Sequence, residues 1–362
     1  MKKTKLCAGD WIEVRSKEEI LATLDQRGQL DGMPFMPEMF QSCGRRFRVW
    51  KRAHKTCDTV LKTGGRWVKD AVHLEELRCD GMGHGGCQAA CLLFWKTNWL
   101  KPAAAPSGRE QPANPAPAPD RPTKAAPSCR EEDVFAGTRA EGLQVETDPT
   151  YACQATRLPY FTTPLPWWDP RQYWEDCSSG NVGLGRVLSS FLFWGYYLLT
   201  QLGFGGPTLR RIYDKFQNLR DGPPFPIRMG LVPSGQPTPT CTLNLQPGEL
   251  VRIKSHQQIL ATLDMNSKNR GLYFDKEEVP YCNKTYRVRS RVDRIIDERT
   301  GKMLPLKTES VILEGVYCQA RYSDRRLFCP RAIYPMWREV WLDRVEQDGS
   351  GNEESKPVRD PI

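Results

Sequence analysis

Three cysteines and one histidine fall within thirteen positions of the stretch RCDGMGHGGCQAAC, residues 78–91. Zinc takes four nitrogen or sulfur ligands in a tetrahedron, and an iron–sulfur cluster takes four thiolates, so both need donors that converge on tight turns. The four glycines of this stretch permit positive φ angles, which let a backbone curl around an ion. The spacing therefore indicates a metal site.

The predicted ligand set extends to an H-x-x-C pair upstream of this stretch, at His54 and Cys57. Zinc is the first choice of metal because it is the more common structural ion, and an iron–sulfur cluster is the alternative. The alternative hypothesis is that these cysteines are buried free thiols that bind no metal. The predicted ligands are Cys57, Cys79, Cys87 and Cys91, with His84 and His54 as substitutes.

An internal duplication gives these residues a comparison within the chain. Residues 9–49 match residues 248–288 at a constant offset of 239, and both copies contain ILATLD. Beyond residue 79 the offset becomes 242, so that Trp95 and Trp99 fall on Trp337 and Trp341. A repeated unit of about a hundred residues indicates two homologous domains rather than a solenoid.

The second copy keeps only some of the candidate ligands. Cys43, Cys79 and Cys87 have the cysteine counterparts Cys282, Cys318 and Cys329, whereas His54, Cys57, His84 and Cys91 have none. Either the shared cysteines are structural and the metal site belongs to the first copy, or both copies carry sites and the second is degenerate. We favour the first interpretation, because several donors differ together.

Each copy reads as a series of short strands with a helical turn at ILATLD. Alternation of apolar and polar residues predicts strands at WIEVR, RFRVWKR and AVHLEEL and at their counterparts. This pattern predicts a mainly β protein with some α, built from two homologous SH3-like small β-barrels. The predicted domains are a first repeat at 1–100, a Pro/Ala-rich linker at 101–128, a partly helical middle region at 129–240, a second repeat at 241–346 and a disordered tail at 347–362.

The apolar run 187–206 carries no charge and is almost long enough to cross a bilayer. Its serines, threonine, glutamine and glycines favour a buried or interfacial helix, with a membrane span or a docking helix as the alternatives. The chain shows no secretory signal at its N-terminus and has thirteen cysteines, an odd number. We therefore expect a cytoplasmic protein, with association to a membrane surface through 187–206 left open.

The phrases RAHKTCDT, CDGMGHGGCQAAC and FCPRAIYPMWREVWL resemble a family of uncharacterised bacterial cysteine-rich proteins. The resemblance covers both repeats and the segment that begins TYACQATRLPYF. It implies that the Cys/His set is a family feature, and it assigns no catalytic residue.

No phosphate-binding loop, dinucleotide fingerprint or nucleophile motif occurs in the chain, and no small-molecule substrate is identifiable. The net charge of +9 permits nucleic acid as a partner but supports it weakly, because no long run of like charges concentrates it. A protein partner is the stronger expectation. The sequence thus predicts a metal-binding accessory or interaction protein, with a metal-dependent enzyme or an iron–sulfur redox protein as the alternatives.

Overall fold

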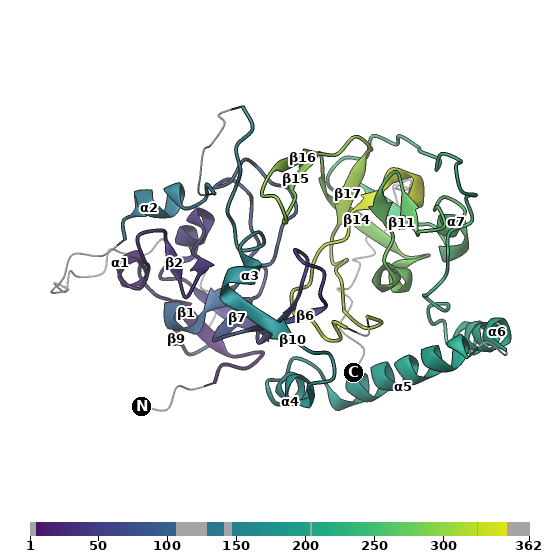
Figure 1. Cartoon of the computed structure of the whole chain (residues 1–362), viewed down its shortest axis with the longest axis horizontal. Coiled ribbons are helices and arrows are strands. Elements are labelled where there is room, and N and C mark those ends of the chain that lie inside the picture. Colours follow the sequence, from purple (N-terminus) through teal and green to yellow (C-terminus); the bar gives the residue numbers. More distant parts are fainter. Residues whose placement is uncertain (1–4, 106–128, 141–146, 203–204, 324, 346–362) are drawn as a thin grey trace, which may run out of the picture. The chain divides into compact units, whose positions relative to one another are not determined.

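A computed structural model describes residues 5–105, 129–140, 147–202, 205–323 and 325–345 (Figure 1). The chain forms two compact units. Unit 1 consists of Met1–Gly183, Arg294–Leu304 and Phe328–Arg331, and unit 2 consists of Leu184–Asp293, Pro305–Leu327 and Ala332–Ile362. Unit 1 therefore contains two short segments from the second half of the chain. Most of the predicted linker and all of the predicted tail lie outside the described residues.

The main sheet of unit 1 is antiparallel, with the strand order β8-β7-β4-β1-β9. Its strands are β1 (Trp11–Val14), β4 (Arg46–Arg52), β7 (Ala71–Leu74), β8 (Trp95–Lys96) and β9 (Leu100–Pro102). A second sheet has the order β10-β6-β5 and consists of β10 (Thr162–Leu165), β6 (Gly65–Val68) and β5 (Lys55–Cys57). Two small pairings join β2 (Gln29–Leu30) to β3 (Met33–Pro34) and β15 (Arg294–Ile296) to β16 (Met303–Pro305).

The helices of unit 1 are short. They are α1 (Lys17–Leu21), α2 (Glu131–Ala136), α3 (Leu158–Phe161) and α4 (Pro170–Ser178), with the 3₁₀ helices η1 (Pro37–Ser42) and η2 (Thr97–Trp99). A capping box between Ser16 and Glu19 starts α1, and the buried Ile20, Leu21 and Leu24 of ILATLD follow it. Trp99 fixes the end of this turn, because its Nε1–H donates to Thr23 Oγ1 at 3.1 Å.

Unit 2 has a sheet of the corresponding order, β18-β17-β14-β11-β19. Its strands are β11 (Leu250–Ile253), β14 (Thr285–Arg291), β17 (Ser310–Leu313), β18 (Trp337–Arg338) and β19 (Leu342–Arg344), with β12 (Lys268–Asn269) paired to β13 (Leu272–Tyr273). Its helices are α5 (Leu184–Gln201), α6 (Gly206–Asn218) and α7 (His256–Leu260), with η3 (Lys276–Tyr281) and η4 (Glu339–Trp341). Trp341 repeats the role of Trp99 and donates to Thr262 Oγ1 at 2.9 Å.

The prediction of SH3-like barrels is wrong. The edge strands β8 and β9 pair with β7 and β1 and not with each other, so the sheet of unit 1 stays open. These edge strands have only two and three residues, and η2 separates them along the chain. The described residues form several small antiparallel sheets mixed with short helices, and they contain no closed barrel.

Among the described residues, no helix combines the length and the apolar character that crossing a membrane requires.

Candidate metal centre in unit 1

The glycine-rich stretch forms a closed loop that returns His84 to Cys79. The Cys79 N–H donates to Cys91 O at 2.8 Å, and the N–H of His84 donates to Gly81 O at 3.1 Å. Gly81 has a φ of +74°, and a Cβ on it would lie 2.1 Å from Cys87 O, so only glycine fits there. As a result Cys79 Sγ and His84 Nε2 lie 3.5 Å apart.

Glu38 completes a group of three possible metal ligands. One donor atom each from Glu38, Cys79 and His84 lie within 4.8 Å of one another. Glu38 comes from η1, about forty residues before the loop, and both it and His84 are buried. A carboxylate, a thiolate and an imidazole are all ligands that zinc accepts.

Burial disfavours the charged form of each member of this group. It raises the pKa of Glu38, although the nearby Cys79 thiol opposes this effect, and it raises the pKa of Cys79 well above its usual range. It also lowers the pKa of His84 to about 4. A cation between them would reverse the preference for Glu38 and Cys79, because metal binding requires deprotonated ligands.

The position that aligns with Glu38 in residues 248–288 also carries a buried glutamate, and this one has backbone partners. Glu277 stands at the position of Glu38 and accepts from the backbone N–H groups of Arg321 and Tyr322 at 2.7 and 2.6 Å. Both carboxylate oxygens of Glu38 are buried beside the Cys79 thiol and make no hydrogen bond of normal geometry with the described residues, and Nδ1 of His84 has no partner there. Buried polar groups are normally hydrogen-bonded or bound to a metal. Glu38 and His84 therefore have acceptor and donor atoms that a bound metal ion could satisfy.

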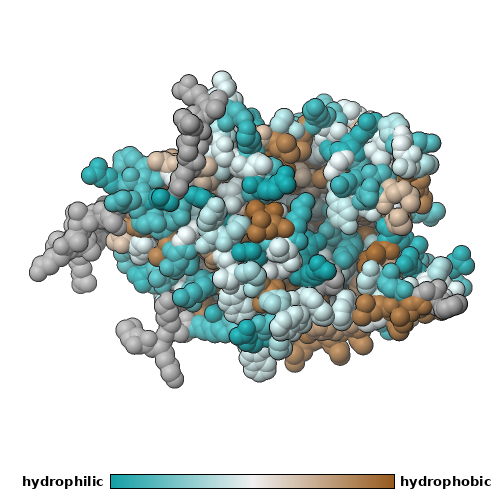
Figure 2. All heavy atoms as spheres, in the orientation of Figure 1, coloured by the Kyte–Doolittle hydropathy of each residue, from teal (hydrophilic) through white to brown (hydrophobic). Residues whose placement is uncertain are grey.

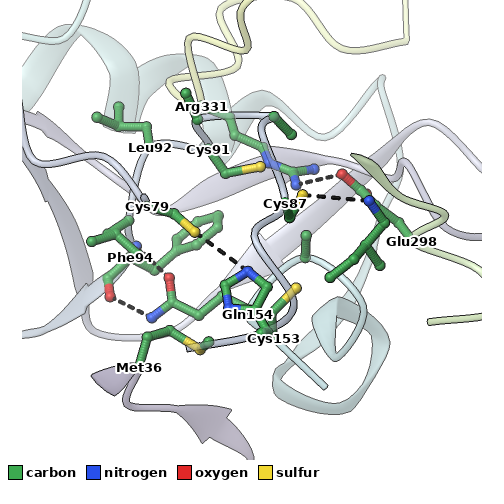
Figure 3. A pocket seen from close by; sticks show the side chains of 16 residues that line it. Met36, Cys79, Cys87, Cys91, Leu92, Phe94, Cys153, Gln154, Glu298 and Arg331 are labelled. Atoms are coloured by element: carbon green, nitrogen blue, oxygen red, sulfur yellow. Dashed lines mark hydrogen bonds and ion pairs between the residues drawn. The ribbon is translucent and has the colours of Figure 1, made fainter. Parts of the chain in front are cut away.

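Three further thiols share a cavity with this group. The cavity is partly open to solvent, and its lining includes Cys79, His84, Cys87, Cys91 and Cys153. Figure 3 shows the sulfur atoms of the four cysteines turned toward the same space. Burial raises the pKa of Cys91 to about 12 and that of Cys153 to about 11, so both are neutral thiols without a bound cation.

Cys153 reaches the cavity because the next residue anchors its segment. Gln154 accepts from the Phe94 N–H at 2.8 Å, and its amide donates to Phe94 O at 2.9 Å and to Pro34 O at 3.0 Å. Sequence reasoning missed both Cys153 and Glu38. Glu38 could have been noticed because the offset of 239 aligns it with another glutamate, Glu277. Cys153 could have been noticed because the tripeptide Cys-Gln-Ala occurs both at 87–89 and at 153–155.

Arg331 and Glu298 close the cavity from the segments contributed by the second half of the chain. Arg331 is buried and donates to Glu298 at 3.1 Å and to Thr59 Oγ1 at 2.7 Å. Burial alone would lower the pKa of Arg331, but the Glu298 carboxylate raises it, so the guanidinium keeps its charge. The cavity is thus lined by cysteine thiols and by the Arg331 guanidinium, whose charge is balanced by Glu298.

The other predicted ligands lie elsewhere in unit 1. Cys57 lies on β5, where its N–H donates to Cys329 Sγ at 3.1 Å, and it does not line the cavity. His54 Nε2 lies 3.2 Å from Gln172 O and 3.3 Å from Asp176. Cys79, His84, Cys87 and Cys91 therefore line one cavity, and Cys57 and His54 do not line it.

No family model, curated protein or solved structure matches this chain.

Proposed function

We propose that the protein is a metal-binding accessory protein, in which unit 1 holds one zinc ion through Glu38, Cys79 and His84. The observation that carries the proposal is the contrast between two glutamates. The buried oxygens of Glu38 lie beside the Cys79 thiol and make no hydrogen bond of normal geometry in the described part of the chain, whereas those of Glu277 accept from two backbone amides. Three protein ligands leave one tetrahedral position for water or for a neighbouring thiol.

A role in binding another protein is supported by the surface of unit 1. Tyr160, Trp168 and Trp174 are between 67% and 75% exposed. Large aromatic side chains are enriched at the energetic centres of protein interfaces, so their exposure fits an accessory protein better than an isolated enzyme.

An iron–sulfur cluster is the second candidate for the same cavity. The specific observation is that four thiols, those of Cys79, Cys87, Cys91 and Cys153, line one cavity (Figure 3). Four thiolates are the usual ligand set of such clusters, and Glu38 would then lie outside the ligand set.

Metal content and absorption of protein purified without oxygen test both candidates. For zinc we expect about one ion per chain, which is lost in Glu38→Gln, Cys79→Ser and His84→Gln. The matched controls are Glu277→Gln and Cys318→Ser, the equivalent positions of the second repeat, which should keep the ion.

Iron with inorganic sulfide, lost in Cys153→Ser and retained in Glu38→Gln, would replace zinc by the cluster. Protein that carries neither metal and binds none on titration would refute a metal-binding function.

A further inference from the structure

The helices α5 and α6 of unit 2 expose their apolar sides. On α5, Leu184, Leu188, Leu192 and Leu199 are between 52% and 76% exposed. Residues three, four and seven positions apart share one side of a helix, so these leucines form a continuous stripe. Figure 2 shows hydrophobic side chains gathered along the lower edge of the view, where Figure 1 places α5.

The opposite side of α5 packs within unit 2. Ser190 and Thr200 are buried there, and the ring of Phe193 lies 4.7 Å from that of Tyr322 and 5.9 Å from that of Phe225. Most helices of soluble domains bury their aliphatic side, and α5 instead buries polar and aromatic residues. The exposed leucines are therefore available to a partner.

A second stripe on α6 has the same character. Ile212 and Phe216, together with Leu219 just beyond the helix, are between 50% and 85% exposed at helical spacing. The Tyr196 hydroxyl donates to Leu209 O at 2.6 Å, and the ring centroids of Tyr196 and Tyr213 lie 5.8 Å apart. These contacts hold α5 and α6 together as one helical pair.

Basic side chains border this pair. Arg211, Lys215 and Arg220 are exposed, whereas the one acidic residue between 184 and 220, Asp214, forms an ion pair with Arg228. A leucine and phenylalanine stripe bordered by Arg and Lys is the pattern of helices that lie on anionic membranes. A protein interface would instead concentrate aromatic residues and exclude lysine.

We propose that α5 and α6 bind the surface of an anionic phospholipid membrane, with the leucine stripe inserted among the headgroups and Arg211, Lys215 and Arg220 on the phosphates. This surface is independent of the metal centre, because all its residues belong to unit 2. A lipid surface fits best, since it offers apolar chains to the leucine stripe and phosphate groups to the basic side chains that border it.

Vesicle flotation tests the proposal. The full chain is mixed with vesicles of phosphatidylcholine and phosphatidylserine, or of phosphatidylcholine alone, at low and high salt. We expect binding to the anionic vesicles, weakened by salt, and weakened about tenfold or more in Arg211→Glu/Lys215→Glu. The conservative pair Arg211→Lys/Lys215→Arg should bind like the parent.

The apolar stripe is tested by Leu188→Glu/Leu192→Glu, which should abolish flotation. Its control is Leu61→Glu/Leu304→Glu, which places the same charges on exposed leucines of unit 1. Circular dichroism verifies that each variant folds. Equal flotation of the stripe variant and the parent, or no flotation of the parent, overturns the proposal. Self-association of the parent that the stripe variant loses, without vesicle binding, would replace the membrane by a second copy of the chain.

Discussion

Protonation of His73 should destabilise unit 1 as the pH falls. His73 lies on β7 with no exposed surface, and its Nδ1–H donates to Leu93 O at 2.9 Å. Its Nε2 is buried without a partner among the described residues, so a second proton there would have no acceptor. Burial, with a smaller contribution from nearby basic residues, lowers the pKa of His73 to about 3.

The magnitude follows from proton linkage. The unfolded chain binds the proton near the ordinary imidazole pKa of 6.5, whereas the folded chain stays neutral down to about 3. The stability from the neutral imidazole is therefore present above pH 6.5 and is lost as the pH falls through that value. At pH 5 the loss amounts to about 2 kcal/mol, since pH 5 lies about 1.5 units below the pKa of the unfolded chain and each unit corresponds to about 1.4 kcal/mol.

The duplication supplies the variant. Ile312 stands at the position of His73 in the second repeat and is fully buried. His73→Ile should therefore pack acceptably and remove the titration, although it also removes the hydrogen bond to Leu93 O at every pH. Between pH 7.5 and pH 5, the free energy of unfolding should fall by about 2 kcal/mol less in the variant than in the parent.

Hydrogen exchange of a peptide that covers β7, corrected for the intrinsic rate at each pH, measures the opening free energy of this region alone. Ile312→Val is the control and should leave the pH dependence of β7 unchanged. An equal loss of stability in the parent and in His73→Ile would refute the reasoning, because His73 would then not be held neutral in the folded chain.

Further predictions concern buried polar contacts and thiol reactivity. Gln154→Ala should lower the free energy of unfolding of unit 1 by about 3 kcal/mol, since it leaves the buried Phe94 and Pro34 backbone groups unpaired; urea unfolding measures this, and a loss below about 1 kcal/mol would contradict it. Glu339→Ala should destabilise unit 2 by about 3 kcal/mol, because Glu339 accepts from the amides of residues 243–245 and from Arg291, and calorimetry of the parent and the variant gives the comparison. Of the cysteines, Cys241 alone is exposed, so a thiol reagent should modify it faster than the others. This fast phase of modification should vanish in Cys241→Ser and persist in Cys282→Ser, a control at a buried cysteine.

Local features of the fold could be predicted from the sequence because they depend on neighbouring residues. The strand prediction at RFRVWKR is confirmed by β4, and the helical turn at ILATLD is confirmed by α1 and α7 together with the turn residues that follow. Closure into a barrel could not be read from the strands, because it depends on pairing between edges that the alternation pattern does not describe.

The candidate site divides in the same way. Cys79, His84, Cys87 and Cys91 converge through one glycine-rich loop, so their spacing was informative. Glu38 and Cys153 join them from other segments, and only the tertiary fold brings them near. Cys57 was expected to join the loop as a ligand, yet it lies on β5 and does not line the cavity, and its backbone N–H donates to Cys329 Sγ.

The composition of unit 1 constrains the order in which the protein can form during synthesis. The segments 294–304 and 328–331 belong to unit 1, and Glu298 and Arg331 line its cavity. The ribosome makes them 111 to 148 residues after Gly183, which at ordinary elongation rates is a delay of about 5 to 30 s. During that interval the cysteines of the nascent chain lie in an unfinished cavity, exposed to oxidants and to competing metals. A chaperone would protect them, and so would an early-bound ion if the proposed metal-binding function holds. In that case, the yield of metal-loaded protein should depend on the metal supply during translation and not only after it.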